Sequence, residues 1–213
     1  MACLILFVFF RTYRGLGIHS RPKYSASHET YKRELISILQ RFSELARDLD
    51  IEYWILSGTL LGLMRDGEIL PWDDDVDVAL TRESYNALEH HPSLQANLNR
   101  LDLIACFSNN PDRPPKVRIK GQHYPFLDLI VYDREDGFLV NPRFADEYFR
   151  ADEVFPPKNC SLHGVATLCP SRPEPYLERA FGSYASWVLF GTHWTIPRTY
   201  ATHGVPGEKE DFR

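Results

Sequence analysis

The stretch ILSGTLLGLMRDGEILPWDDDVDVAL, residues 55–80, decides the fold of this chain. It opens with a short apolar run and a turn of small residues, Ser57-Gly58-Thr59, which a segment of helical character follows. Four carboxylates then lead into a second apolar run, at Asp73, Asp74, Asp75 and Asp77. The pattern predicts a buried strand, a turn, a short helix and an acidic strand in succession.

From residue 75 onward, acidic and apolar residues alternate with the period of a β-strand. Side chains two residues apart on a strand share a face, so Asp75 and Asp77 lie on one face and the apolar residues on the other. Their Cβ atoms are about 6 to 7 Å apart, and both can lean toward one hard cation. Asp128, within FLDLIV, is the candidate third carboxylate, because a buried acid needs a metal or a hydrogen-bonding partner. Asp73 and Asp74 precede the strand and are set aside.

Other interpretations of these acids use the same residues. A run of aspartates is often only a solvated loop or a helix cap, but Asp77 lies in a strand pattern, where aspartate is disfavoured. A calcium loop of the EF-hand type fails on spacing counted from Asp73, because the required glycine and glutamate are absent from their positions. Asp128 alone could be a core acid paired with Arg118 or Lys120.

The Ser57-Gly58-Thr59 turn supplies the second half of the candidate site. A helix that begins there directs free backbone N–H groups at an anion, and glycine lets a phosphate approach the backbone closely. A metal-bound pyrophosphate held between this turn and the acidic strand has the geometry that phosphoryl transfer needs. A glycine between a strand and a helix is often only a connection. The turn therefore indicates a phosphate site only in combination with the downstream acids.

Composition limits the class of protein. The chain has 213 residues, which fit one domain, and its 44% apolar content argues against disorder. With 24 basic and 29 acidic residues the net charge is −5, so no basic field favours nucleic acid as a partner. A small phosphorylated ligand stays compatible, because a bound cation inverts the local electrostatics around carboxylates.

The rest of the chain predicts a series of short elements around this stretch. We expect helices from near Ser27 to 49, over 59–65 with Gly67 as its end, over 81–88 with Thr81 as cap, and up to 181 with Ser171 and Glu174 as a capping box and Gly182 as stop. We expect strands at 51–56, 101–107, 116–120 and 126–132, and a hairpin over 159–168.

Several features bear on the compartment. Cys160 and Cys169 flank the hairpin, and they either pair across it or stay as buried free thiols. Asn159-Cys160-Ser161 is a formal N-glycosylation sequon, which matters only in a secretory compartment. His163 and His193 lie in segments of loop character, and we expect neither to be catalytic.

The N-terminus is apolar over residues 2–10 and is followed by Arg11 and Arg14. Nine apolar residues are half of the ~20 that a spanning helix needs. The favoured interpretation is the stub of a signal anchor whose upstream part is missing, and a signal-like segment or a disordered apolar end stay open. We therefore divide the chain into an N-terminal stub and linker, 1–26, and a single domain, 27–213.

GTLLGLMRDGEILPWDDDVDVAL resembles the signature of the LicD family, which includes fukutin and fukutin-related protein, within the nucleotidyltransferase superfamily. Gly58-Thr59 matches the family's turn, Asp75-Val76-Asp77 its acidic pair, and Phe126-Leu127-Asp128 the strand with the third acid. VFPPKNCSLHGVATLCP and YLERAFGSY resemble its C-terminal hairpin and helix, so the likeness spans about 31–184. The resemblance implies an α/β (α+β) fold, a nucleotidyltransferase-type mixed sheet flanked by helices, with a C-terminal hairpin and helix.

The resemblance also implies a metal-dependent phosphotransferase. Such an enzyme moves a phospho-alcohol or phospho-sugar unit, with phosphocholine and ribitol phosphate as precedents, from a nucleotide diphosphate donor, CDP-linked in the first place, to a hydroxyl of a glycan or glycoprotein. Asp75 and Asp77 would hold Mg²⁺ or Mn²⁺, and Asp128 would be a further ligand or the base that takes the acceptor's proton. Donor phosphates would meet Ser57, Gly58 and Thr59, and charge would be neutralised by Arg65, Lys116 and Arg118.

The resemblance also leads us to expect a cellular location, and two alternative functions remain to be compared with it. We expect the secretory pathway, in the Golgi or the ER lumen, with membrane anchoring through the N-terminal apolar segment. The rivals are an Asp-x-Asp glycosyltransferase, which does not require the Gly58-Thr59 turn, and an inactive relative that binds a glycan or a partner as a scaffold. The chain departs from secretory members of the family in lacking their long N-terminal stem, and its tail after Trp187 matches no part of the family.

Overall fold

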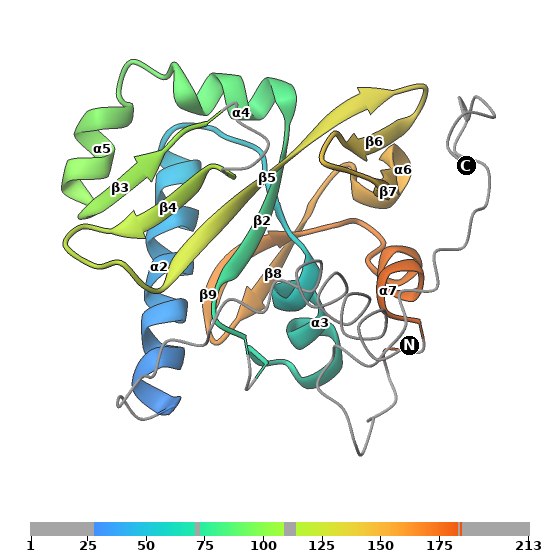
Figure 1. Cartoon of the computed structure of the whole chain (residues 1–213), viewed down its shortest axis with the longest axis horizontal. Helices are drawn as coiled ribbons and strands as arrows, with labels where there is room; N and C mark the ends of the chain where they lie inside the picture. Colours follow the sequence, from blue (N-terminus) through green and yellow to red (C-terminus); the bar gives the residue numbers. More distant parts are fainter. Residues whose placement is uncertain (1–27, 71–72, 109–113, 183, 185–213) are drawn as a thin grey trace, which may run out of the picture.

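A mixed β-sheet forms the centre of the molecule (Figure 1). The computed structural model describes residues 28–70, 73–108, 114–182 and 184. The described helices are α2 (His28–Asp48), α3 (Ser57–Asp66), α4 (Arg82–Glu89), α5 (Leu94–Arg100), α6 (Ala151–Val154) and α7 (Glu174–Phe181). The described strands are β1 (Trp54–Ile55), β2 (Val76–Thr81), β3 (Leu103–Cys106), β4 (Lys116–Ile119), β5 (Phe126–Glu135), β6 (Phe138–Asn141), β7 (Phe144–Arg150), β8 (Lys158–Leu162) and β9 (Val165–Cys169).

The sheet is built on a parallel pair of strands, β2 and β5. Its order is β1-β2-β5-β4-β3, with β6 and β7 added where β5 extends, and every described pair other than β2–β5 is antiparallel. β8 and β9 form a separate two-stranded sheet. The mixed α/β fold that the sequence predicts, with flanking helices and a C-terminal hairpin and helix, is therefore confirmed.

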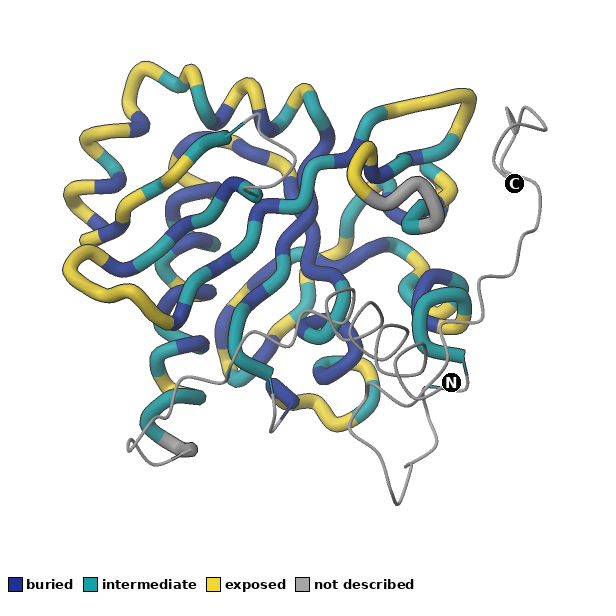
Figure 2. Tube along the Cα trace, viewed as in Figure 1, coloured by how far each residue is buried: buried dark blue, intermediate teal, exposed yellow. Residues whose placement is uncertain are grey.

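The core lies between the sheet and α2. This helix presents a stripe of buried apolar residues at helical spacing, including Ile38, Phe42 and Leu45, and it packs across β2, β4 and β5. Alternate residues of β2, such as Val76 and Val78, are fully buried on that side. Figure 2 shows this burial along the central strands. The apolar face of β2 is thus fixed, which leaves its acidic face directed away from α2.

A cluster of aromatic rings holds the second half of the chain to the sheet. The indole of Trp54 lies 5.8 to 5.9 Å, between ring centroids, from the rings of Tyr132, Phe149 and Phe155. Phe149 in turn stacks on Tyr176 of α7 at 4.2 Å. These contacts join β1, β5, β7 and α7, elements that bound the same end of the sheet.

Most predicted helix ends are confirmed. Gly67 ends α3 at a φ of 72°, and the Thr81 hydroxyl accepts a hydrogen bond from Ser84 N at the start of α4. The capping box at Ser171 is wrong, because α7 begins at Glu174 with Pro173 before it. The Ser171 backbone is used elsewhere: its N–H donates to the Val154 carbonyl and its carbonyl accepts from Lys158.

The C-terminal hairpin contains a disulfide. Cys160 and Cys169 are joined, with their Cα atoms 5.9 Å apart, so the alternative of two free thiols is wrong. The hairpin packs on α2 and β1 through β9. Its one face is buried and its other face is exposed, as expected for a half-buried two-stranded sheet.

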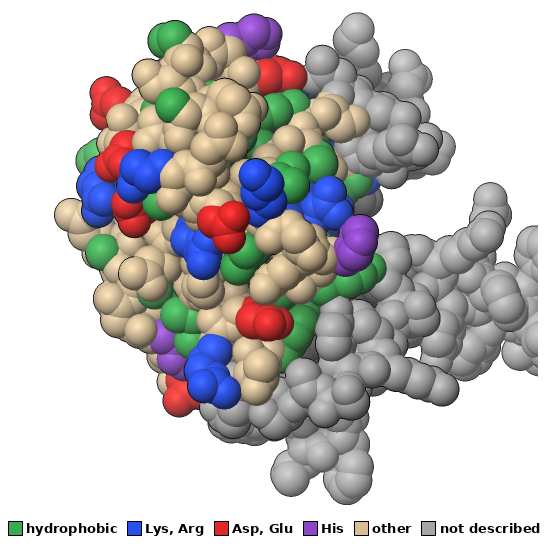
Figure 3. Space-filling view, turned by 90° about the vertical axis from the view of Figure 1, so that its left-hand side faces the viewer, with side chains coloured by type: hydrophobic (Ala, Val, Ile, Leu, Met, Phe, Trp, Pro, Cys, Tyr) green, Lys and Arg blue, Asp and Glu red, His purple; other side chains and the backbone are tan. Residues whose placement is uncertain are grey.

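Some features of the sequence lie outside the described residues, among them the apolar segment 2–10, His193 and the tail after Trp187. Within the described part, no helix is both long and apolar enough to cross a membrane. On the face that Figure 3 shows, the described basic and acidic side chains are interspersed. In the described part, Arg100 forms ion pairs with both Glu44 and Asp48.

Candidate metal and phosphate site

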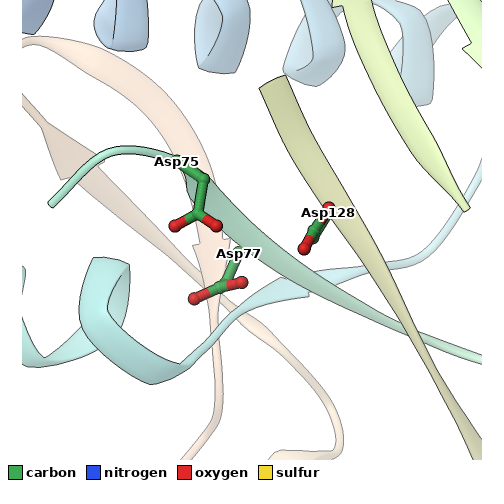
Figure 4. A group of neighbouring side chains, drawn as sticks. All are labelled: Asp75, Asp77 and Asp128. Carbon is green, nitrogen blue, oxygen red and sulfur yellow. The ribbon is translucent and has the colours of Figure 1, made fainter. Parts of the chain in front are cut away.

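Three carboxylates converge on the side of the β2–β5 pair that faces away from α2 (Figure 4). Asp77 of β2 and Asp128 of β5 are direct partners in the parallel register, and Asp75 lies two residues before Asp77, on the same face. One carboxylate oxygen from each lies within 4.8 Å of the others. The sequence-predicted pair and its third acid are therefore brought together, because the register of β2 on β5 aligns their side chains.

Burial and mutual repulsion disfavour the charged forms of these acids. Burial, followed by the Asp128 and Asp74 carboxylates, raises the pKa of Asp75 to about 7. Burial and then Asp75, Asp128 and Asp73 raise the pKa of Asp77 well above its usual value. A set of three carboxylate oxygens with no softer ligand suits Mg²⁺ or Mn²⁺, and a divalent cation would replace the protons that the metal-free cluster retains.

Lys116 is the predicted basic residue that the structure brings to the acids. Its Nζ lies 2.7 Å from Asp128 Oδ1 and 3.4 Å from the centre of the Phe126 ring. The alternative interpretation paired Asp128 with Arg118 or Lys120, but the described ion pair is with Lys116, the residue opposite Asp128 in the β4–β5 register. The predicted site thus gains one positive charge at the edge of the cluster.

The other two predicted basic residues have different described contacts. Arg65, in the last turn of α3, pairs with Asp66 at 2.6 Å. Arg118 donates to Cys106 Sγ at 3.5 Å, across the β3–β4 pair. A role for either in charge neutralisation stays a prediction.

The Ser57-Gly58-Thr59 turn lies beside the acidic strand. The Thr59 hydroxyl accepts a hydrogen bond from Asp77 N at 2.9 Å, which ties the first turn of α3 to β2. Ser57 has a φ of 49°, and its Oγ lies 3.4 Å from the hydroxyl of Tyr176 in α7. No side chain caps the start of α3 in the described structure, so its first N–H groups remain compatible with an anion. A contact of this turn with phosphate stays a prediction.

Asp73 is a site residue that the sequence argument missed. Its carboxylate lies against Gly58: a Cβ at that glycine would be 2.7 Å from Asp73 Oδ2. This oxygen is buried without a hydrogen-bond partner, and burial, then Asp75 and Asp74, raise the pKa of Asp73 well above its usual value. The glycine therefore makes room for a carboxylate. The spacing of two from Asp73 to Asp75 to Asp77 was the signal that could have found it.

The connection from α3 to β2 is held from several sides, which fixes the acids. A Cβ at Gly62 would be 2.3 Å from the Glu68 carbonyl oxygen, so the chain folds directly back on α3. Ile69 N donates to His163 Nε2 at 3.1 Å, from the turn of the disulfide-linked hairpin. The Tyr31 hydroxyl of α2 donates to the Asp74 carbonyl. His163 thus contacts the backbone that leads to the acids, a contact that sequence reasoning did not suggest.

The family follows from residues 50–172, which match the family model described as LicD/FKTN/FKRP, nucleotidyltransferase domain. The chain belongs to this family. The matched residues include the turn of α3 and the acids of the site, Asp73, Asp74, Asp75, Asp77 and Asp128. The fold implied by the resemblance, of nucleotidyltransferase type, is the one that this family model describes.

Individual relatives are similar at modest identity. An uncharacterized protein of Rickettsia prowazekii is 24% identical over 206 residues, which cover 89% of this chain and 73% of that protein. The lipopolysaccharide cholinephosphotransferase LicD of Haemophilus influenzae is 29% identical, covering 46% of this chain and 41% of its own. The human ribitol 5-phosphate transferase FKRP is 24% identical, covering 62% and 28%. This chain thus spans less than half the length of each named transferase. Both of these relatives transfer phosphorus-containing groups, and the predicted enzyme class is confirmed at the level of the family.

Solved structures give a weaker likeness. The crystal structure of ANT(2")-Ia in complex with adenylyl-2"-tobramycin is 17% identical with a TM-score of 0.38, over 65% of this chain and 70% of that chain. The solution structure of ANT(2'')-Ia is 17% identical with a TM-score of 0.42, over 66% of each. At these TM-scores the likeness carries no argument about this chain.

Proposed function

We propose that this chain is a metal-dependent phosphotransferase that moves a phospho-alcohol or phospho-sugar unit from a CDP-linked donor to a hydroxyl of a glycan or glycoprotein. The observation that carries the proposal is the convergence of Asp75, Asp77 and Asp128 beside the start of α3. The kind of unit transferred is taken from the names of the LicD and FKRP relatives.

The residues of the site divide the chemistry among them. Asp75 and Asp77 would hold the cation, which when bound neutralises the diphosphate and polarises the phosphorus that is attacked. The first N–H groups of α3, at Gly58 and Thr59, would bind donor phosphate oxygens. Lys116 would add a positive charge next to Asp128. Asp128 is a further ligand or accepts the proton of the acceptor hydroxyl as that oxygen attacks phosphorus and nucleoside monophosphate leaves.

Two features favour this reaction over its rivals. An Asp-x-Asp glycosyltransferase needs its acids but not a helix that begins beside them, whereas Thr59 here joins that helix directly to Asp77. A scaffold has no need of a buried, mutually repelling set of carboxylates, because such a set costs stability without a cation. A single domain over 27–213, anchored to a membrane through 1–26 in the Golgi or the ER lumen, belongs to the same proposal; the Cys160–Cys169 disulfide supports an oxidising compartment.

A donor screen tests the proposal. The full chain is incubated with Mg²⁺ or Mn²⁺, a panel of cytidine and guanosine diphosphate conjugates and a glycan acceptor, and the released nucleotide is identified. Release of CMP that a chelator abolishes is the expected result. Release of a nucleoside diphosphate would indicate sugar transfer, and the absence of metal-dependent nucleotide binding by calorimetry would indicate a scaffold.

A further inference from the structure

The sequon Asn159-Cys160-Ser161 has the exposure that a modification site needs. It is the single Asn-x-Ser/Thr sequence without proline in the 213 residues. Asn159 and Ser161 lie two apart on β8 and both are exposed, so they share the solvent face of the hairpin. Cys160 points to the opposite face, where it is bonded to Cys169. The two residues that define the sequon are therefore exposed, while its central residue is partly buried.

The surroundings of Asn159 leave room for a large group. β8 pairs with β9 alone in the described part of the chain, so the outer edge of β8 has no described strand beside it. Asn159 also lines a hollow of about 660 Å³ between the hairpin and α2, to which Gln40 and Ser43 contribute. A bulky polar group at Asn159 would cover the strand edge and would not enter the core.

The disulfide is an independent observation that points to the same compartment. Stable structural disulfides form where the environment is oxidising, as in the ER lumen. N-linked glycans are added in that compartment, so the Cys160–Cys169 bond and the sequon that contains Cys160 are consistent with one folding environment.

We propose that Asn159 is an N-glycosylation site that takes an oligosaccharide from a lipid-pyrophosphate-linked donor. Asn159 Nδ2 forms a bond to C1 of the first sugar and loses one proton. The bond between C1 and the pyrophosphate oxygen breaks, and the lipid pyrophosphate leaves with the electron pair. No oxidant or reductant takes part, and the acids of β2 and β5 have no part in the step.

The hairpin sets when this modification can occur. In the folded chain Asn159 is the direct partner of Leu168 in the β8–β9 register, so its backbone belongs to an antiparallel ladder. A transferring enzyme must bind the sequon before that ladder and the disulfide close. Glycosylation therefore precedes closure of the hairpin.

The test uses the full chain behind a cleavable secretory signal in human cells. Treatment with peptide N-glycosidase should lower the mass of the secreted chain by one glycan and convert Asn159 to aspartate, read by mass spectrometry of the peptide. Asn159→Gln and Ser161→Ala should lose the shift, and the conservative Ser161→Thr should keep it. These exposed positions are not expected to affect folding, which retention of the Cys160–Cys169 disulfide verifies.

Two results would overturn the proposal. One is a secreted wild-type chain with its disulfide intact and no glycosidase-sensitive mass. The other is a shift that occurs in Cys169→Ser but not in wild type, which would mean that hairpin closure outruns the modification. Transfer activity is not measured in either case, so failure here leaves the phosphotransferase proposal untouched, and failure of the donor screen leaves this one untouched.

Discussion

Two regions of this molecule bury polar side chains, which are hydrogen-bonded to one another in one region and repel one another in the other. Under the β8–β9 hairpin, the Tyr53 hydroxyl lies 2.8 Å from Ser43 Oγ and 2.9 Å from Thr167 Oγ1, so three hydroxyls satisfy one another. On the side of β2 that faces away from α2, Asp75 and Asp77 repel each other, and burial raises the pKa of both. The first arrangement contributes stability in the metal-free protein, whereas the second lowers it.

The comparison distinguishes buried polar groups that stabilise the fold from buried polar groups that suit a ligand. A satisfied buried network holds elements together, here α2, β1 and β9. A buried set of like charges persists only where another group compensates it, and the Lys116–Asp128 ion pair supplies one positive charge against several acids. The acidic site is therefore expected to depend on a ligand for its stability, and the hairpin is not.

The largest expected effect is that of Asp77→Asn on transfer. The variant loses one cation ligand, so kcat/KM should fall by more than about a hundredfold. Burial and neighbouring acids raise the pKa of Asp77, so the carboxyl group costs stability that an amide does not. The metal-free variant should therefore unfold at an equal or higher denaturant concentration than wild type. Asp74→Asn is the matched control, since it makes the same change beside the three carboxylates proposed to hold the ion. Full activity in Asp77→Asn would show that Asp77 is not needed as a cation ligand.

Two glycines of α3 should respond differently to alanine, because different atoms oppose a Cβ at each. At Gly62 the Cβ would meet the Glu68 carbonyl of the backbone at 2.3 Å, so Gly62→Ala should lower the free energy of unfolding by about 1 to 3 kcal/mol, despite alanine's better helix propensity. At Gly58 it would meet the end of the Asp73 side chain, which can turn away. Gly58→Ala should therefore keep most of its stability in denaturant unfolding while altering metal-dependent transfer. Equal losses of stability in the two variants would contradict this assignment.

The pKa of Asp75 predicts how pH acts on the metal-free protein. This pKa rises from 3.8 to about 7 in the folded chain, so between these values the folded state holds a proton that the unfolded state has released. The contribution of Asp75 to stability is thus fully present below about pH 4 and is lost as the pH rises through 7. Cation binding must displace this proton, so Mg²⁺ affinity should increase by up to about tenfold per pH unit below pH 7.

Isothermal calorimetry and denaturant unfolding at several pH values measure both effects. Asp75→Asn is the control for stability, because it keeps the side-chain shape and has no proton to lose. Its unfolding free energy should vary less steeply with pH between 4 and 7 than that of wild type. The same slope in both proteins would show that Asp75 is not the group that titrates.

Parts of the site were predictable because strand parity is local. The alternation around Val76 and Val78 placed Asp75 and Asp77 on one face without reference to the rest of the chain. The partner of Asp128 depended on register, which sequence spacing does not specify, and in the β4–β5 register that partner is Lys116. Local sequence patterns predict which residues of one strand share a face, but not which residue of a neighbouring strand lies opposite.

The missed features have two physical causes, tertiary contacts and an interrupted strand pattern. Asp73 precedes β2, so its spacing of two from Asp75 was outweighed by its place before the strand, and its burial against Gly58 is a tertiary contact. The β6–β7 hairpin was not predicted, because acidic residues interrupt the apolar alternation of FADEYFR. Likewise, the Ser171 cap failed because its backbone bonds to Val154, far from it in the sequence. At Asp73 and Ser171, local preference gave way to tertiary contacts.

The smallest expected effect comes from the hairpin side of the comparison. Tyr53→Phe removes the hydroxyl shared by Ser43 and Thr167 and should lower the free energy of unfolding by about 1 kcal/mol, with transfer unchanged. Tyr148→Phe makes the same change at a half-buried ring with Arg179 over it, and should cost less than about 0.5 kcal/mol. Denaturant unfolding without metal compares the two. A loss in Tyr53→Phe no larger than in Tyr148→Phe would mean that the three hydroxyls under the hairpin do not act as a stabilising network.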